Sequence, residues 1–284
     1  MSELRQQMID AMVLRGFADR TQTSYVAAVR GLAKHFHRSP DELSNADVQQ
    51  FLLHHLNDGT WSYSTCNLTL NAVRFLFREV LKRSPNEICL PGPKQPQRLP
   101  EILSREEVVR LLDAAKEPKY RVLLMTTYAA GLRVSEVCGL HVRDIDSDRM
   151  TIRVNQGKGG RDRYTLLSNA LLDQLRRYWQ TYRPREWLFV RTDGVSPMSI
   201  GTAQKVFYAA RNRAGIKKRI GIHGLRHAFA THLMESGVDI NTIQRLMGHR
   251  SVRTTMRYFH LSQGRISGTH SPFELLEGAK PPPH

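Results

Sequence analysis

The sequence is poor in cysteine and in acidic residues and has no long apolar run, and each shortage argues against a class of protein. Its three cysteines, Cys66, Cys89 and Cys138, show no Cys-x-x-Cys spacing, so neither a disulfide framework nor a zinc finger is expected. No apolar stretch is long enough to cross a bilayer, and residues 1–7 show no signal-peptide core. We therefore expect a protein of the reducing cytoplasm with no membrane partner.

The shortage of acidic residues leaves a large excess of positive charge. Lys+Arg 42 against Asp+Glu 26 gives a formal net charge of +16 and a pI of about 10.2. Hydrophobic residues make up 40% of the chain, which is typical of a globular protein rather than a disordered one. A basic globular protein suits a polyanion, nucleic acid before an anionic membrane, although charge alone is also compatible with a basic protein that binds neither.

The spacing of apolar residues predicts a mainly α-helical chain with two domains. Residues 1–83 show helical periodicity throughout and predict a small helical bundle without an evident catalytic cluster. Residues 84–103 are rich in proline, which cannot sit inside one helix, and we interpret this stretch as a linker. A second domain is expected over residues 104–262, and a thin polar tail over residues 263–284.

The second domain combines helices with one small β-hairpin. It opens at Ser104, where a serine followed by Glu107 forms a capping box ahead of apolar residues. Two predicted strands, 150–154 and 163–167, flank a glycine-rich hairpin tip over residues 155–162. The helices expected after the hairpin span residues 168–182, 199–214, 223–236, 240–247 and 252–260. The expected fold class is therefore mainly α, with an α+β second domain.

Residues 222–258 gather side chains that suit phosphate chemistry. His223 and Arg226 open the stretch, His249 follows a glycine, and Tyr258 lies on the next predicted helix. A guanidinium offers forked donors that match phosphate oxygens, and imidazoles donate hydrogen bonds or move protons near neutral pH. A tyrosine hydroxyl can act as a covalent nucleophile, but a tyrosine at helical spacing is more often an ordinary packed aromatic.

Two more cationic residues lie upstream of this stretch. Arg133 follows Gly131, a helix-ending glycine, and together with Arg226 it can grip the two non-bridging oxygens of one phosphodiester. Taken alone, an arginine in such a place is more often a surface residue. Lys158 at the hairpin tip is either a flexible surface lysine or a mobile ammonium that protonates a leaving oxygen.

Three histidines, His223, His227 and His232, raise the question of a zinc site. The His-Glu-x-x-His pattern is missing, and no nearby carboxylate or cysteine completes a ligand set, so no metal is expected. All three cannot share one face of a helix. We expect His223 to face a cleft and either His227 or His232 to support the core.

These segments and their order along the chain resemble the tyrosine recombinase (integrase) family. The resemblance covers residues 1–262, because the helical front domain is similar to the SAM-like core-binding domain of that family. It is nearest to compact bacterial members such as Xer recombinases and mobile-element integrases. The insertion rich in tryptophan and proline that marks integron integrases does not occur between the hairpin and His223. The matching catalytic residues are Arg133, Lys158, His223, Arg226, His249 and Tyr258.

The resemblance implies a mechanism. Tyr258 would attack the scissile phosphate to form a 3′-phosphotyrosine, and Lys158 would protonate the leaving 5′ oxygen. The two arginines, His223 and His249 would bind and stabilise the phosphate, and His223 can also act as the base toward the tyrosine. The phosphodiester energy stays in the covalent link, so the family chemistry implies neither a cofactor such as ATP nor a metal.

The resemblance also implies partners. We expect a C-shaped clamp on double-stranded DNA recombination sites, a homotetramer on two sites, association with the nucleoid, and strand exchange through a Holliday junction. A second recombinase or accessory protein is compatible with this scheme, and the tail over residues 263–284 either docks into a neighbouring protomer or is disordered. The alternative functions are a DNA-binding protein without chemistry and a relaxase of the type IB topoisomerase class. The target sequence and the biological role, whether dimer resolution, integration, excision or cassette exchange, stay open.

Overall fold

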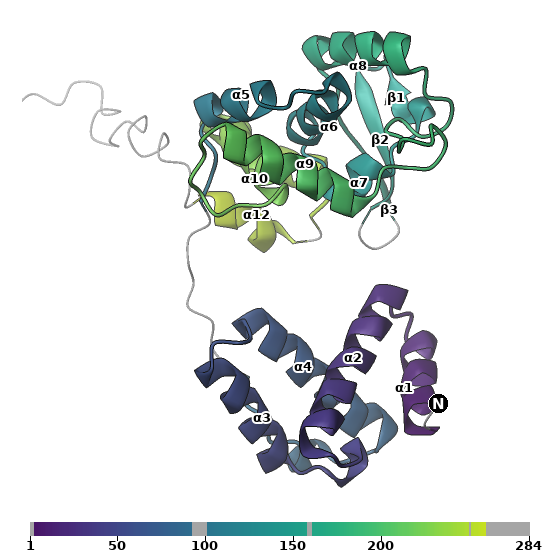
Figure 1. Ribbon diagram of the computed structural model, residues 1–284, viewed down its shortest axis with the longest axis vertical. Coiled ribbons are helices and arrows are strands. Elements are labelled where there is room, and N and C mark those ends of the chain that lie inside the picture. Colours follow the sequence, from purple (N-terminus) through teal and green to yellow (C-terminus); the bar gives the residue numbers. More distant parts are fainter. Residues whose placement is uncertain (1–2, 93–100, 158–160, 250, 260–284) are drawn as a thin grey trace, which may run out of the picture. The chain divides into compact units, whose positions relative to one another are not determined.

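Helices dominate the protein, and one small sheet accompanies them (Figure 1). The chain divides into two compact units, Met1–Arg98 and Leu99–His284. Among the described helices, none is long and apolar enough to cross a membrane. The computed structural model describes residues 3–92, 101–157, 161–249 and 251–259.

The first unit is a helical bundle, as predicted. Four long helices and three short turns form it: α1 (Glu3–Leu14), α2 (Asp19–Phe36), η1 (Pro40–Glu42), α3 (Asn45–Asn57), α4 (Tyr63–Phe75), η2 (Leu76–Val80) and η3 (Pro85–Glu87). Its core consists of apolar side chains spaced at helical intervals, including Met12, Leu32, Phe51 and Phe77. Ser44 caps α3 by accepting a hydrogen bond from the backbone N–H of Asp47.

Both ends of the proline-rich stretch 84–103 are packed rather than free. Leu90 is buried in the core of the first unit, and its carbonyl accepts a hydrogen bond from Arg74. The carbonyl of Cys89 accepts another from Gln49 at 3.0 Å. At the other end, Leu103 is buried in the core of the second unit. The segment between the two cores is therefore shorter than the stretch rich in proline.

The second unit places helices around a three-stranded antiparallel sheet of order β1-β2-β3. The predicted hairpin is present, with Arg153 opposite Tyr164 and an irregular register between Val154 and Gly157. The structure adds a short strand, β1, and a short helix, α7, that the sequence did not predict. The elements are α5 (Arg105–Asp113), α6 (Pro118–Ala129), α7 (Val134–Cys138), η4 (Val142–Asp144), β1 (Ile145–Asp146), β2 (Thr151–Gly157), β3 (Arg161–Leu166), α8 (Asn169–Tyr182), α9 (Ile200–Arg213), α10 (His223–Glu235), α11 (Ile240–Met247) and α12 (Val252–Phe259).

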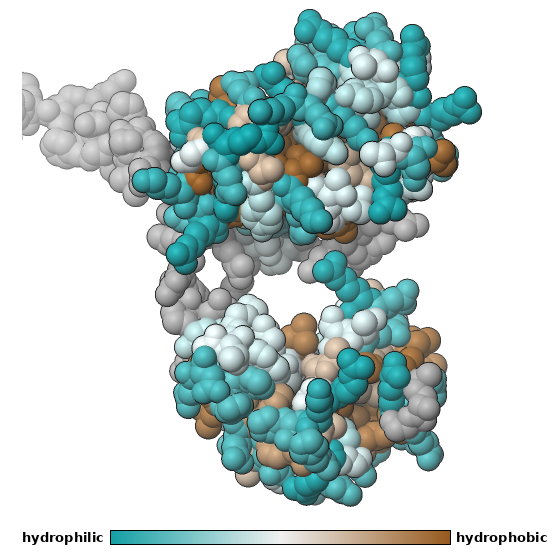
Figure 2. All heavy atoms as spheres, viewed as in Figure 1, coloured by the Kyte–Doolittle hydropathy of each residue, from teal (hydrophilic) through white to brown (hydrophobic). Residues whose placement is uncertain are grey.

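Helix α6 lies at the centre of the second unit and packs against α5, α7, α8, α9 and α10. A smaller apolar cluster joins α10 to α11 through Phe229, Ile243 and Met247. In Figure 1, α12 lies beside α10, and the two helices are in contact. Hydrophilic residues cover most of the visible surface, with scattered hydrophobic side chains (Figure 2). Because α10 is enclosed by neighbours, polar side chains on it become buried, and Arg226 is one of them.

Candidate active site

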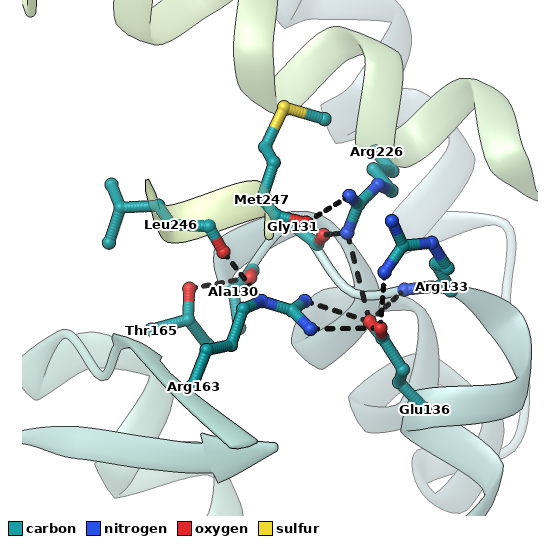
Figure 3. A network of polar contacts seen from close by, with 9 residues as sticks. All are labelled: Ala130, Gly131, Arg133, Glu136, Arg163, Thr165, Arg226, Leu246 and Met247. Atoms are coloured by element: carbon teal, nitrogen blue, oxygen red, sulfur yellow. Dashed lines mark hydrogen bonds and ion pairs between the residues drawn. The ribbon is translucent and has the colours of Figure 1, made fainter. Parts of the chain in front are cut away.

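Three arginines converge on one buried carboxylate, Glu136 (Figure 3). Arg163 donates two parallel hydrogen bonds, from Nη1 to Oε1 at 2.9 Å and from Nη2 to Oε2 at 2.8 Å. Arg133 donates from Nη1 to Oε1 at 2.6 Å, and Nη1 of Arg226 lies 3.7 Å from Oε2. Burial alone would raise the pKa of Glu136, but the hydrogen bonds and charges of Arg163 and Arg133 lower it to about 2. The carboxylate is therefore ionised at neutral pH and holds the three cations together.

The turn between α6 and α7 puts Arg133 and Glu136 into this cluster. Gly131 ends α6 with φ +61, and a Cβ at this position would lie 2.4 Å from the ring of Phe229. Arg133 then precedes α7, and its backbone N–H donates to the Glu136 carboxylate at 2.8 Å. A carboxylate in the first turn of a helix is also favoured by the helix dipole. The local sequence thus aims the guanidinium and its partner at the same point.

Arg226 connects two chain segments that are far apart in sequence. Its side chain is almost completely buried on α10, at 1% exposure. Nη1 donates to the carbonyl of Gly131 at 2.6 Å, and Nη2 donates to the carbonyl of Met247. A buried guanidinium needs such partners because an unpaired charge in the interior is very costly. Arg226 therefore fixes the end of α6 against the end of α11.

His249 follows directly after α11. The helix ends at Gly248 with φ +61, and the backbone carbonyl of His249 accepts a hydrogen bond from Gln244 at 3.0 Å. Nδ1 of the imidazole lies 2.9 Å from the hydroxyl of Thr255. Burial, followed by the charges of Arg226 and other nearby cations, lowers the pKa of His249 to about 4. The imidazole is therefore neutral at pH 7.

The other histidines of α10 have different surroundings. His223 starts the helix three residues before Arg226, and burial followed by the charges of Arg226 and Arg133 lowers its pKa. Its ring meets that of His227 edge-on, with centroids 4.5 Å apart. His232 lies deeper, 2.8 Å from the Tyr128 hydroxyl and 3.0 Å from the carbonyl of Leu103. The prediction that His227 or His232 supports the core is confirmed for His232.

The structure leaves two predicted site residues, Lys158 and Tyr258, without a described side chain. Lys158 lies outside the described residues, although the strands that precede and follow it are present. Tyr258 belongs to α12, and its side chain lies outside the described part of the chain. Helix α12 packs against both α10 and α11, and its Thr255 is fully buried. Helix α12, which includes Tyr258, is thus in contact with α10, which carries Arg226, and with α11, which ends just before His249.

Glu136, Arg163 and Thr255 also belong to this cluster, although none of them was predicted from the sequence. A signal for Glu136 was its place three residues after Arg133 in the first turn of a helix. For Arg163 the sequence contains no such signal, because alternation along β3 predicts that apolar Tyr164 and Leu166 face the core. In the structure these two side chains are exposed, and Thr165 is buried on the face that carries Arg163. In the described part of the chain, no group of His, Cys, Asp or Glu side chains is placed to hold a metal ion.

Comparisons with known proteins show the family to which the chain belongs. Residues 101–265 match the Phage integrase family, and residues 4–87 match the family described as Phage integrase, N-terminal SAM-like domain. The Sinorhizobium fredii protein y4qK, which carries an integrase/recombinase name, is 42% identical over 285 residues, covering 100% of this chain and 92% of that protein. The tyrosine recombinase XerD of Yersinia pestis is 34% identical over 289 residues, covering 94% of this chain and 95% of its own length. The chain belongs to the phage integrase family of tyrosine recombinases.

Solved structures show the same fold. XerH recombinase bound to palindromic difH substrate matches with a TM-score of 0.74 at 23% identity, over 92% of this chain and 82% of that chain. A lambda integrase tetramer bound to a Holliday junction matches with a TM-score of 0.77 at 18% identity, over 95% of this chain and 78% of that chain. The predicted fold class is therefore confirmed: the chain is mainly helical, with a small sheet in the second unit.

Proposed function

We propose that this recombinase cuts and rejoins DNA at specific sites through a 3′-phosphotyrosine intermediate and a Holliday junction. One observation carries the proposal: Arg133 and Arg226 converge on Glu136, and the helix that bears Tyr258 packs against the helix that bears Arg226. Such an arrangement concentrates positive charge close to the helix of the proposed nucleophile. It suits the negative charge that builds up on a phosphodiester while a tyrosine attacks it.

Each residue has a role in the proposed reaction. The oxygen of Tyr258 attacks the phosphorus, the P–O5′ bond breaks, and Lys158 gives its proton to the departing 5′ oxygen. Arg133 and Arg226 bind the non-bridging oxygens, with neutral His249 and His223 as further donors. His223 can also accept the tyrosine proton. The 5′-hydroxyl of a partner strand then attacks the phosphotyrosine and restores the diester.

The electrostatic support for this reaction is built before DNA arrives. Glu136 holds Arg163 and Arg133 through hydrogen bonds of 2.6 to 2.9 Å, and backbone carbonyls hold Arg226. Donors that are already oriented need no reorganisation when charge develops on the phosphate, which is where most electrostatic catalysis comes from. The mechanism requires no group other than side chains of this chain and DNA.

The partners follow from the relatives and from the charge. The structures of XerH on difH substrate and of a lambda integrase tetramer on a Holliday junction support double-stranded DNA sites and a tetramer for this chain. With a net charge of +16, the two units would close on duplex DNA as a C-shaped clamp in the cytoplasm, on the nucleoid. Residues 84–103 would connect a DNA-binding domain over 1–83 to a catalytic domain over 104–262. Residues 263–284 would dock into a neighbouring protomer, and a second recombinase can take part.

Covalent capture tests the proposal. The protein is first incubated with fragments of its own genome to find the captured site, and then with a nicked duplex that carries this site and traps the cut strand. A denaturing gel should show a covalent adduct that Tyr258→Phe abolishes. An adduct that survives in Tyr258→Phe would overturn the assignment of the nucleophile. Binding without any adduct would favour a DNA-binding protein without chemistry, and relaxation of plasmids irrespective of site would favour a topoisomerase.

A further inference from the structure

The contact between His249 and Thr255 joins the site to the helix of the nucleophile. Nδ1 of His249 lies 2.9 Å from Oγ1 of Thr255, and Thr255 is fully buried on α12. Its neighbour Thr254 is exposed. Thr255 precedes Tyr258 by three residues, and positions three apart on a helix lie close on its surface. One side-chain hydroxyl therefore links the imidazole to the helical turn that carries Tyr258.

The contact with Thr255 matters chemically because a neutral His249 carries its proton on only one of its two ring nitrogens. The titratable and charged groups that lower the pKa of His249 come from three elements: Arg226 and His223 from α10, Arg163 from β3, and Arg133 from the turn before α7. Burial and then these charges lower the pKa of His249 to about 4, so the ring carries a single proton at neutral pH. That proton sits on either Nδ1 or Nε2, and the hydrogen bond at one nitrogen decides which.

We propose that Thr255 is a positioning residue whose hydroxyl donates to Nδ1 of His249 and thereby keeps the imidazole proton on Nε2. The step rests on the proposed function, because the non-bridging oxygens of a phosphodiester only accept hydrogen bonds. A neutral imidazole contributes to their binding only through an N–H. With Nδ1 occupied as an acceptor, Nε2–H becomes the donor to the scissile phosphate. The same hydrogen bond couples the orientation of the His249 Nε2–H group to the packing of α12 against α10 and α11.

A purely structural role for Thr255 predicts different results. A buried threonine can simply satisfy its hydroxyl, and its loss would then lower stability without affecting the histidine tautomer or acting through His249. Thr255→Val keeps the branched shape and removes the hydroxyl, whereas Thr255→Ser keeps the hydroxyl. Thr254→Val makes the same replacement at an exposed position of the same helix.

The first experiment needs no DNA. The full-length protein is labelled with nitrogen-15 in its histidines, and the His249 resonances are assigned from a His249→Gln spectrum. At pH 7 the ring of His249 should show protonated Nε2 and unprotonated Nδ1 in the wild type and in Thr255→Ser, with a shift toward protonated Nδ1 in Thr255→Val. Protonated Nδ1 in the wild type, or an unchanged tautomer in Thr255→Val, would overturn the proposal even if recombination is never observed.

The second experiment measures single-turnover cleavage of the nicked duplex at saturating protein. Thr255→Val should cleave about 10- to 100-fold more slowly, Thr255→Ser within about threefold of the wild type, and Thr254→Val at the wild-type rate. In a His249→Ala background, Thr255→Val should cause no further loss, because it acts through the imidazole. An equal loss in both backgrounds, or a loss that serine does not rescue, would contradict the role. Absence of an adduct in the wild type would instead refute the proposed function, and the tautomer experiment would still decide the role of Thr255.

Discussion

The cores of the two units differ in what they bury. Among the described residues, Thr69 is the buried polar residue of the first unit, whose core otherwise consists of hydrophobic side chains. The second unit buries Arg226, Asp144, His232 and several threonines in addition to its apolar core. Glu136, with a side chain that is 6% exposed, joins this set. One unit thus keeps its charges at the surface, and the other takes charges into its interior.

This difference separates the requirements of folding from those of chemistry. Burying apolar side chains stabilises a fold at about 25 cal/mol for each Å² removed from water, whereas a buried charge stabilises nothing unless its partners compensate for lost hydration. The second unit meets that condition by pairing Arg226 and Arg163 with Glu136 and backbone carbonyls. The catalytic role that we propose for this site would explain why such charges are retained where hydrocarbon would pack more simply.

Arg226→Gln should produce the largest effect. The variant loses the buried guanidinium that we propose as a phosphate ligand, and we expect the rate of adduct formation at saturating protein to fall by about 10³-fold. The control is Arg38→Gln in the first unit, where the arginine is 48% exposed and pairs with Glu42 at 3.8 Å. It should cleave at the wild-type rate once binding is saturated. Equal losses in both variants would refute the distinction between a buried catalytic charge and an exposed one.

Glu136→Gln tests whether the buried carboxylate stabilises the second unit. Its pKa is about 2 against an ordinary 4.5, which corresponds to about 3 kcal/mol of stability above pH 4.5. A folded-state pKa below the unfolded value means that this contribution is lost as pH falls from 4.5 toward 2. The stability gap between wild type and variant, measured by urea unfolding with hydrogen exchange of α7 and β3, should therefore shrink over that range.

Leu32→Ala is the matched change in the first unit. Leu32 is fully buried among apolar side chains, and its truncation should cost about 3 kcal/mol through lost contacts and the cavity left behind. Because no ionisable group is involved, the loss should not vary between pH 2 and pH 7. A similar pH dependence for Leu32→Ala and Glu136→Gln would mean that the carboxylate is not the source of the effect.

The helices and their capping residues can be predicted well from the sequence. The helix expected at residues 240–247 is α11, Ile240–Met247, and the capping box expected at Ser104 is present with Glu107. Periodicity and capping are local properties, so a single sequence contains them. The β-hairpin is also predicted from a local pattern, two strand-like segments on either side of a glycine-rich stretch, and β2 and β3 pair as expected.

The ion pairs around Glu136 cannot be predicted from the sequence in the same way. The sequence predicts Arg133 and Arg226 as phosphate ligands, and the structure shows that both reach Glu136. That Arg163 on β3 also pairs with Glu136 depends on how the sheet packs against α7. Contacts of this kind join residues far apart in sequence, and apolar periodicity contains no information about which buried cation meets which carboxylate.

Two glycines with the same backbone conformation allow a smaller comparison between the units. Gly59 in the first unit has φ +63 and Gly248 in the second has φ +61. A Cβ at Gly59 meets nothing within 4 Å, whereas a Cβ at Gly248 would lie 2.8 Å from Cδ of Arg163. Gly59→Ala should cost about 1 kcal/mol from the left-handed conformation alone. Gly248→Ala should cost about 1 kcal/mol more by urea unfolding, because Arg163 is held by Glu136 and cannot easily move. Equal costs would show that Arg163 is free to give way.

The smallest effect concerns two histidines with the same hydrogen bond. Nδ1 of His232 lies 2.8 Å from the hydroxyl of Tyr128 in the second unit, and Nδ1 of His55 lies 2.9 Å from that of Thr60 in the first. The contact in the second unit is part-buried and the contact in the first unit is exposed, so water replaces only the latter when it is lost. Tyr128→Phe should therefore cost about 1 kcal/mol, and Thr60→Val less than about 0.5 kcal/mol. Urea unfolding of each variant measures both values, and a larger cost for Thr60→Val would contradict the rule that burial, rather than hydrogen-bond length, sets the energetic worth of polar contacts in this protein.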